Sequence, residues 1–421
     1  MKSAIYILLS CTVSLKVFSQ TVYINSISTS RQSNGDNGYT LDGLRMTAGS
    51  RPKLLNPNNF SLTGIYPKNV LIFDGYSTSG SLNTVSNIPL NNIFFFGSFN
   101  KNDISTQPFT LDEIDSLYNW SLRGGKLIIA SGGSYSTFFD ANILNSKWGY
   151  SYQSQNPCSF IPTSYGTGTD IFNGPFGNVI AANQGAAAQG YFNSVTTNSK
   201  ILATDANGNA TLFMDCNTLD LIISDVDGYT DLGGITSGAT IINAQDKFWT
   251  NTIVFMDNLQ PLPVITKVSN TLTLNSTYIS YQWYLNNTPV IYNGNQSYNA
   301  SENGNYYVEV TVNGGCTVRS NILTIDSIET DLVELPNIFS PNGDGINDTF
   351  IPTRLAGIKI NQIFIFNRWG KLVYNKTNPI TLWDGKINNN DSTEGVYYWI
   401  LEYQDSMETM GKKTGFVQLI R

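Results

Sequence analysis

Two aspartate-rich loops carry the side chains in this sequence that are best suited to bind a ligand. The first loop contains Asn342, Asp344 and Asp348, and oxygen-bearing side chains spaced around glycines are typical of calcium loops. Its spacing differs from that of the twelve-residue EF-hand loop. We therefore favour the alternative that these side chains form metal-free Asx turns, and we keep calcium as a candidate cofactor.

The second loop contains Asp225 and Asp227 and comes directly after an apolar, strand-like run. Ligands of open α/β sheets bind at the carboxyl ends of the strands, so this loop is a candidate binding site. A Gly-rich turn that follows another apolar run, with Ser131, Gly132 and Gly133, would reach the same sheet edge. The alternative, which we favour, is that Asp225 and Asp227 only build a turn.

The absence of histidine excludes most hydrolytic chemistry. A chain without imidazole cannot build a Ser-His-Asp or Cys-His nucleophile, nor the usual histidine-containing zinc site. Carboxylate-pair glycoside hydrolysis and oxygen-ligand calcium binding remain. A serine in the Gly-rich turn would lack a base, so we expect no catalytic residues and no enzyme.

Composition and charge narrow the class of protein further. The chain has 421 residues, of which 41% are hydrophobic and 13% charged, and a net charge of −7. The length predicts two or three domains, and the hydrophobic content is that of a globular chain. An acidic chain without a basic run lacks the charge pattern of a nucleic-acid-binding protein.

Residues 1–19 have the pattern of a signal peptide. Lys2 precedes an apolar stretch from Ala4 to about Leu15, and small or apolar residues follow at the cleavage site. The alternative is a lipoprotein signal that ends at Cys11. Only about six apolar residues would precede that cysteine, so we expect ordinary export.

Export permits disulfide bonds among the cysteines that follow the leader. Cys158 and Cys216 fall in the same region of the sequence, and we predict that they pair. Cys316 is left over. We expect Cys316 to be a small buried hydrophobic residue rather than an intermolecular partner.

Residues 20–260 alternate strand-like and helix-like segments. Apolar runs at 70–73, 93–96, 127–130 and 219–223 are typical of buried parallel strands. A helix is expected over 110–120, where Thr110 and Glu113 form a capping box, and another over 244–257. This alternation predicts a doubly wound α/β sheet.

The order of these segments, with GGKLIIASGG and LDLIISDVDGYTD, resembles the glutamine-amidotransferase-like fold. Enzymes of that fold use a cysteine in the turn that Ser131 occupies here, together with a distant histidine. Both are missing, so the resemblance implies a non-catalytic domain whose remaining role is binding.

Residues 263–326 alternate apolar and polar side chains in short runs. They resemble an immunoglobulin-like domain of bacterial surface proteins, with Trp283 as the core tryptophan and Tyr306 at the tyrosine corner. Val308 stands where the second cysteine of that fold would be. The resemblance implies a β-sandwich without an inter-sheet disulfide, most often used as a spacer.

Residues 335–421 consist of short apolar runs separated by Gly, Asn and Asp turns, which predicts a small antiparallel β-sandwich. The motifs SPNGDGIND, FNRWG, WDG, GVYYW and a terminal LIR closely resemble the gliding-motility-associated C-terminal domain. That domain is the type B sorting domain of type IX secretion substrates in Bacteroidota. The positions that match its motifs are Asn342, Gly343, Asp344, Gly345, Asn347, Asp348, Asn367, Arg368, Trp369, Gly370, Trp383, Asp384, Gly385, Gly395, Tyr397 and Arg421.

This resemblance implies secretion across the outer membrane and display at the cell surface. It implies two partners, the type IX translocon and a PorP/SprF-like outer-membrane protein. We expect a non-catalytic adhesion or gliding-motility component, with surface glycan as a candidate ligand. The alternative is a secreted, carboxylate-dependent polysaccharide hydrolase. Glu394 is a departure from the family pattern that we expect to be harmless.

Overall fold

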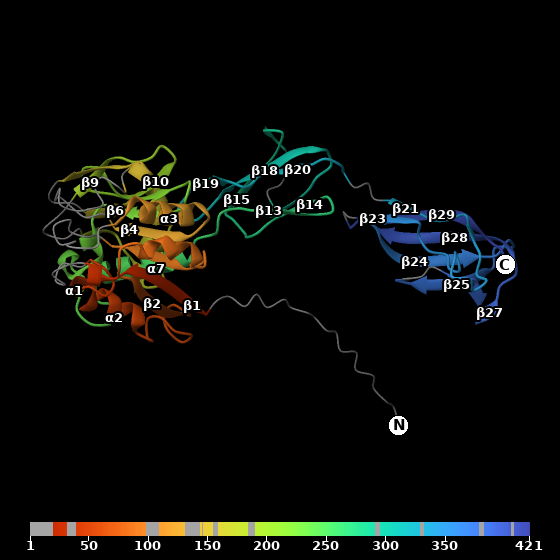
Figure 1. The fold of residues 1–421 in the computed structure, drawn as a ribbon, viewed down its shortest axis with the longest axis horizontal. Coiled ribbons are helices and arrows are strands. Elements are labelled where there is room, and N and C mark those ends of the chain that lie inside the picture. Colours follow the sequence, from red (N-terminus) through yellow and green to blue (C-terminus); the bar gives the residue numbers. More distant parts are fainter. Residues whose placement is uncertain are drawn as a thin grey trace, which may run out of the picture. The chain divides into compact units, whose positions relative to one another are not determined.

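The computed structural model describes residues 20–31, 39–97, 109–130, 144, 146–154, 159–183, 190–290, 295–328, 332–378, 383–405 and 408–421. The chain divides into two compact units. The first comprises the residues up to Leu262 together with Tyr278–Ser280 and Glu309–Arg319. The second comprises Pro263–Thr277, Tyr281–Val308 and Ser320–Arg421. Strands predominate in both units (Figure 1), so the prediction of a multidomain, β-rich chain is confirmed in this coarse form.

The first unit contains an eleven-stranded sheet within the described residues. Its strands are β1 (Thr21–Ile27), β2 (Asn69–Tyr76), β3 (Ile93–Phe96), β4 (Lys126–Ala130), β5 (Ser151–Ser154), β6 (Ser159–Pro162), β8 (Ala182–Asn183), β9 (Gly190–Ser194), β10 (Ser199–Thr204), β11 (Ala210–Asp215) and β12 (Leu221–Ile223). Strands β2, β1, β3, β4 and β12 are parallel neighbours in that order. Strands β11, β10, β6 and β8 then extend the sheet by antiparallel pairing, which the sequence analysis did not foresee. The carboxyl ends of β1, β3, β4 and β12 therefore share one edge.

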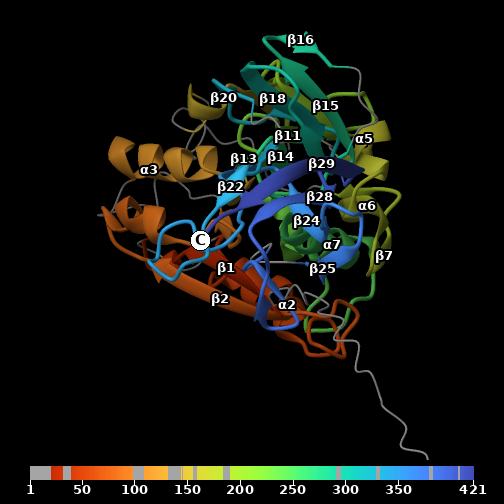
Figure 2. The ribbon, with the colours of Figure 1, turned by 90° about the vertical axis from the view of Figure 1, so that its right-hand side faces the viewer.

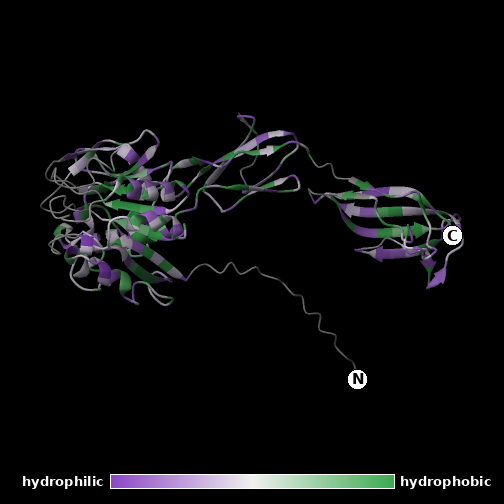
Figure 3. Ribbon diagram, viewed as in Figure 1, coloured by the Kyte–Doolittle hydropathy of each residue, from purple (hydrophilic) through white to green (hydrophobic). Residues whose placement is uncertain are grey.

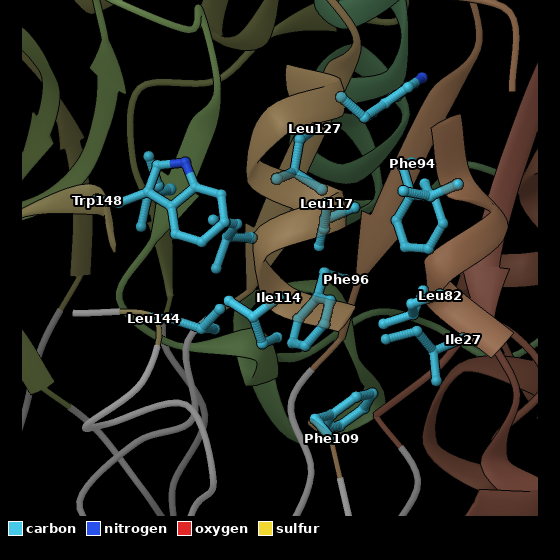
Figure 4. Close-up of a cluster of buried hydrophobic side chains, with 14 of the residues drawn as sticks. Ile27, Leu82, Phe94, Phe96, Phe109, Ile114, Leu117, Leu127, Leu144 and Trp148 are labelled. Atoms are coloured by element: carbon cyan, nitrogen blue, oxygen red, sulfur yellow. The ribbon is translucent and has the colours of Figure 1, made fainter. Parts of the chain in front are cut away.

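Helices pack on both faces of this sheet. Helix α3 (Leu111–Leu122) begins at the expected capping box, and helix α7 (Ala244–Asn258) begins at a second box formed by Asn243 and Asp246. On one face, the cluster in Figure 4 joins Ile114 and Leu117 of α3 to aromatic and aliphatic side chains of β3 and β4. On the other face, Phe95 meets Trp249 of α7 with ring centroids 5.7 Å apart. Successive side chains of β3 thus point to opposite faces of the sheet and pack against different helices.

Shorter helical segments complete the first unit. They are α1 (Leu44–Thr47), α2 (Ser50–Leu55), α5 (Ser164–Thr167), α6 (Asp170–Asn173) and the 3₁₀ turns η1 (Thr29–Arg31), η2 (Ser81–Asn87), η3 (Val226–Tyr229) and η4 (Asp231–Gly233), with the short strand β7 (Gly177–Asn178). Within the described residues, no helix is both long enough and apolar enough to span a bilayer.

Strand β2 corrects one expectation. Three of the four apolar runs lie in buried strands, but Leu71 and Phe73 of β2 are 55% and 61% exposed. Strand β2 is the last strand of the sheet, and exposed residues alternate with less exposed ones along it, so one of its faces stays uncovered. The apolar run therefore predicted more burial than Leu71 and Phe73 have in the structure.

The middle of the chain consists of short antiparallel strands. They are β13 (Ile265–Val268), β14 (Thr271–Leu274), β15 (Ser280–Leu285), β16 (Thr288–Pro289), β17 (Ser297–Asn299), β18 (Gly304–Thr311), β19 (Thr317–Arg319) and β20 (Leu323–Ile325). One sheet has the order β13-β14-β17, and the other joins β16-β15-β18-β19 with β20 beside β18. Trp283 is buried, and the hydroxyl of Tyr306 donates to the carbonyl of Glu302 at 2.8 Å.

The C-terminal part of the second unit has its own core. Its strands are β21 (Leu332–Glu334), β22 (Ile338–Phe339), β23 (Arg354–Ala356), β24 (Lys359–Phe366), β25 (Leu372–Thr377), β26 (Lys386–Ile387), β27 (Asn390–Asp391), β28 (Gly395–Gln404) and β29 (Met410–Leu419). Five of them form a sheet in the order β22-β29-β28-β24-β25 (Figure 2). Its inner face buries Ile363, Trp399 and Val417 together with Trp383. Hydrophobic colouring in these strands alternates with polar positions (Figure 3), as one-sided burial requires.

Candidate functional site

Asp225 and Asp227 follow β12 at the carboxyl edge of the parallel strands, and both are buried (0% and 1% exposed). The Oδ1 atom of Asp225 accepts the backbone N–H of Asp227 at 2.8 Å, which caps the turn η3. The hydroxyl of Thr230 lies 3.4 Å from Oδ1 of Asp227. The other carboxylate oxygen of Asp227 has no hydrogen-bond partner among the described residues. Asp225 thus builds the turn, while Asp227 retains an unengaged oxygen.

The surroundings of this loop make Asp227 easier to protonate than an exposed aspartate. Burial raises the pKa of Asp227 to about 6, against the opposing effects of the Thr230 hydrogen bond and the charge of Arg45. Arg45 itself lies 3.7 Å from Asp231. Burial, reinforced by the charge of Asp227, also raises the pKa of the Tyr39 phenol, which stays protonated at neutral pH. A carboxyl group of this kind can donate a proton more readily than an exposed aspartate.

The predicted companions of this loop, Ser131, Gly132 and Gly133, lie outside the described residues. Their role in binding therefore stays a prediction. The structure brings Tyr39 and Arg45 to the loop instead, and neither was singled out from the sequence.

Asp220 is a second perturbed acid that the sequence analysis missed. Its carboxylate is fully buried, and Oδ2 accepts from the hydroxyl of Ser121 at 2.5 Å and from the indole of Trp148 at 2.6 Å. Burial raises the pKa of Asp220 to about 7, although these hydrogen bonds act in the opposite direction. The signal was present in the sequence, since Asp220 interrupts an otherwise apolar run.

The disulfide of the structure differs from the predicted one. Cys216 bonds to Cys316, 100 positions later in the chain, so the predicted pair of Cys158 and Cys216 is wrong. Cys158 itself lies outside the described residues. Cys316 is buried as expected, but as half of a disulfide. Proximity in the sequence misled the prediction, because the loop before β19 belongs to the same compact unit as β11.

The loop of Asn342, Asp344 and Asp348 uses its oxygen atoms within the loop itself. Both carboxylate oxygens of Asp348 accept backbone N–H groups, from Gly343 and Gly345, at 2.7 Å each. Asn342 accepts the N–H of Asp344, and Asp344 that of Ile346. These bonds are Asx turns. Among the described residues, no group of three or more His, Cys, Asp or Glu side chains could hold a metal ion, and calcium stays a prediction.

Several other motif residues of the C-terminal segment have structural roles. Asn367 accepts the N–H groups of Trp369 and Lys371, which closes the turn between β24 and β25. Trp383 is fully buried and donates its indole N–H to the carbonyl of Lys386. Tyr397 is buried and donates its hydroxyl to the carbonyl of Thr393 at 2.8 Å. Backbone with positive φ occurs at Gly343, Gly345, Asn347, Gly370, Gly385 and Gly395.

Arg421 fastens the end of the described chain to the rest of the C-terminal segment. The guanidinium of Arg421 donates to the carbonyls of Ser392 and Gly385 and lies 3.4 Å from Asp391. The backbone N–H of Arg421 donates to the carboxylate of Glu394 at 2.7 Å. Glu394, which departs from the family pattern, therefore helps to hold the C-terminal end of the described chain. Asp384, of the WDG motif, accepts the N–H of Lys386.

Comparison with known families decides what the C-terminal segment is. Residues 333–419 match the family described as the CHU_C type IX secretion signal domain. This segment is a type IX secretion signal domain. The chain is therefore a substrate of the type IX secretion system, secreted across the outer membrane and displayed at the cell surface. The match covers the sorting domain alone, and the activity of the first unit does not follow from it.

Other comparisons are weak. No curated protein matches the chain. A putative GMP synthase subunit from Thermoplasma acidophilum is 11% identical, with 56% of this chain and 94% of that chain covered and a TM-score of 0.31. Dimeric latent PorU from Porphyromonas gingivalis is also 11% identical, with 57% of this chain and 26% of that chain covered and a TM-score of 0.16. At these TM-scores neither structure supports an argument about function.

Proposed function

We propose that the chain is a non-catalytic adhesion or binding protein, or a component of gliding motility, that the sorting domain carries to the cell surface. The observation that carries this proposal is the sorting domain at residues 333–419. A surface-displayed chain with no histidine and with Asp225 engaged in capping a turn is better suited to binding than to hydrolysis. Surface glycan is the proposed ligand class.

The proposal assigns a role to each part of the chain. The first unit, with five parallel strands and helices on both faces, acts as the binding domain and has a glutamine-amidotransferase-like fold. The strands from β13 to β20 form an immunoglobulin-like spacer; the buried Trp283 and the Tyr306–Glu302 bond support this role. The sorting domain engages the translocon and a PorP/SprF-like outer-membrane protein.

A deletion tests the export part of the proposal. Removal of residues 336–421 should leave the remainder in the periplasm, whereas the full chain reaches the surface and supports attachment of cells to a glycan-coated substrate. The control restores residues 336–421 behind an unrelated exported protein, which should then reach the surface. A surface-displayed chain whose loss leaves attachment unchanged would contradict the adhesion role.

The second candidate function is carboxylate-dependent hydrolysis of polysaccharide. The observation in its favour is that burial raises the pKa of Asp227 to about 6, close to what a general acid needs. The double variant Asp225→Asn, Asp227→Asn separates the two functions. Lost turnover with retained glycan binding would support the hydrolase, and unchanged binding by a chain that never shows turnover supports the adhesin.

A further inference from the structure

The five-stranded sheet of the sorting domain has an outer face that is unusually apolar at one end. The register places one residue of each of four adjacent strands in a single line across the sheet. These residues, which we name the outward row, are Leu372 (β25), Phe366 (β24), Tyr398 (β28) and Phe416 (β29). Figure 2 shows these strands following one another across the domain.

The outward row points away from the domain's own core. Ile365, Tyr397 and Val417 precede or follow Phe366, Tyr398 and Phe416 by one residue and are buried in the core, so these three side chains of the row lie on the opposite face. Leu372 lies beside a register shift in β25, and its pairing with Phe366 and its exposure assign it to the row. Leu372, Tyr398 and Phe416 are exposed, and Val396 and Ile338 add exposed apolar side chains on either side of Gln418. A gathering of exposed apolar side chains on a secreted domain is typical of a binding site.

The turn between β24 and β25 borders this surface and adds an anchor. Trp369 is 78% exposed, and the guanidinium of Arg368 lies 5.0 Å from its ring centroid. Exposed Trp, Tyr and Arg side chains of this kind supply most of the binding energy in protein interfaces. Asn367 holds the turn by accepting two backbone N–H groups, so Trp369 is presented on a fixed scaffold.

Charge indicates the chemistry of the partner. The turn carries two exposed cations, Arg368 and Lys371, and no acid, whereas the whole chain has a net charge of −7. The nearby Glu394 is engaged by the N–H of Arg421. A surface with aromatic side chains beside two cations complements an apolar groove with an acidic rim. The apolar residues spread over four strands, which suits a protein groove better than insertion of a single loop tip into lipid.

We infer that the outward row and Trp369 form the surface by which the sorting domain binds an outer-membrane protein with an acid-rimmed apolar groove. The inference rests on the proposed function, which holds that such a protein anchors the displayed chain, and it goes further by naming the contacting residues. The far end of the same face, where Lys412 pairs with Glu402 and Glu402 with Gln362, is polar and takes no part.

Site-specific photo-crosslinking in the full chain tests the inference. A benzophenone side chain replaces Trp369, Phe416 or, as the matched control on the same face and strand as Phe416, Lys412. Cross-links from positions 369 and 416 should join one integral outer-membrane protein at an acidic, apolar segment, and position 412 should give none. Trp369→Ala should weaken binding to that protein at least about 30-fold, and Arg368→Gln with Lys371→Gln should abolish its salt dependence.

Each other outcome overturns the inference. Equal cross-linking from positions 369 and 412, cross-links to lipid alone, or cross-links to a second copy of this chain would each do so. Trp369 is exposed, so its alanine variant should keep the melting temperature of the parent, which separates lost binding from lost folding. If the expected cross-links form in cells that show no adhesion, the proposed function is contradicted, whereas the inference about this binding surface still holds.

Discussion

The two aspartate-rich loops have similar composition and opposite electrostatics. In the sorting domain, exposed Asp344 accepts the N–H of Ile346, and hydrogen bonding lowers the pKa of its carboxyl group. In the first unit, burial raises the pKa of Asp227 to about 6. The difference shows that burial and hydrogen-bond donors, rather than the Asp-Gly pattern itself, decide how readily the carboxyl group of such a loop loses its proton.

The contrast extends to the ion pairs of the two regions. Arg31 and Glu113 of the first unit are both fully buried and form a bidentate pair, and Lys53 and Asp246 are buried together. The ion pairs of the sorting domain are largely exposed. The first unit should therefore depend strongly on individual polar groups, whereas the sorting domain depends on its aromatic core.

The largest effect should come from the disulfide. Replacing Cys216 and Cys316 by serine removes a cross-link that closes a loop of 100 positions, which should lower the free energy of unfolding of the first unit by about 4 to 5 kcal/mol. Hydrogen exchange followed by mass spectrometry would resolve the two regions in the full chain. Reductant should reproduce the effect in the parent and leave protection of β24, β28 and β29 unchanged; loss of protection there would contradict the contrast.

The next effect should come from the buried ion pair. Glu113→Ala leaves Arg31 charged and buried without its partner, so we expect a loss of about 3 to 5 kcal/mol, measured by chemical denaturation. The matched variant in the sorting domain is Glu402→Ala, which removes the exposed pair with Lys412 and should cost less than about 1 kcal/mol. Equal losses of unfolding free energy in the two variants would contradict the contrast between buried and exposed ion pairs.

Asp227 should give the first unit a measurable dependence on pH. Its pKa in the folded chain is above the ordinary value, so the folded state holds more protons than the unfolded state, and stability falls as pH rises from about 4 to about 6. Asp227→Asn should reduce the stability difference between pH 4 and pH 8 by about 2 kcal/mol. Denaturant titrations at both pH values would measure this difference in the free energy of unfolding. If Asp227→Asn left the difference unchanged, Asp227 would not be a source of the pH dependence.

The smallest effect should have the opposite sign. The lowered pKa of Asp344 adds stability above the ordinary pKa of aspartate, and this contribution is lost as pH falls through the folded value. Asp344→Asn should therefore lower the stability of the sorting domain slightly at neutral pH and not at low pH. A thermal melt of the full chain at each pH checks the direction, and a gain at neutral pH would be evidence against it.

Local patterns predicted local structure well. The capping box of Thr110 and Glu113 and the helix from Ala244 are where the sequence placed them, because caps and helical periodicity act within a few residues. The motifs of the sorting domain identified that segment because several specific turns recur in one order.

Features that depend on distant contacts were missed or misjudged. The Cys216–Cys316 bond, the exposure of Phe73 on the edge strand and the burial of Asp220 all depend on which segments become neighbours in space. A short stretch of chain carries little of that information, and only Asp220, an acid inside an apolar run, left a sign of its burial in the sequence. Asp227 was a candidate because of its place after a strand, but the raised pKa values of Asp220 and Asp227 follow from burial and were not predicted.

The cross-link between Cys216 and Cys316 also determines how the displayed protein responds to tension. A pull applied to the sorting domain is transmitted along the backbone to Cys316, and from there across the sulfur–sulfur bond to Cys216. The intervening chain, which includes α7 and strands β13 to β18, is bypassed and cannot be drawn out while the bond is intact. Under load the displayed chain should thus stretch less than its length allows.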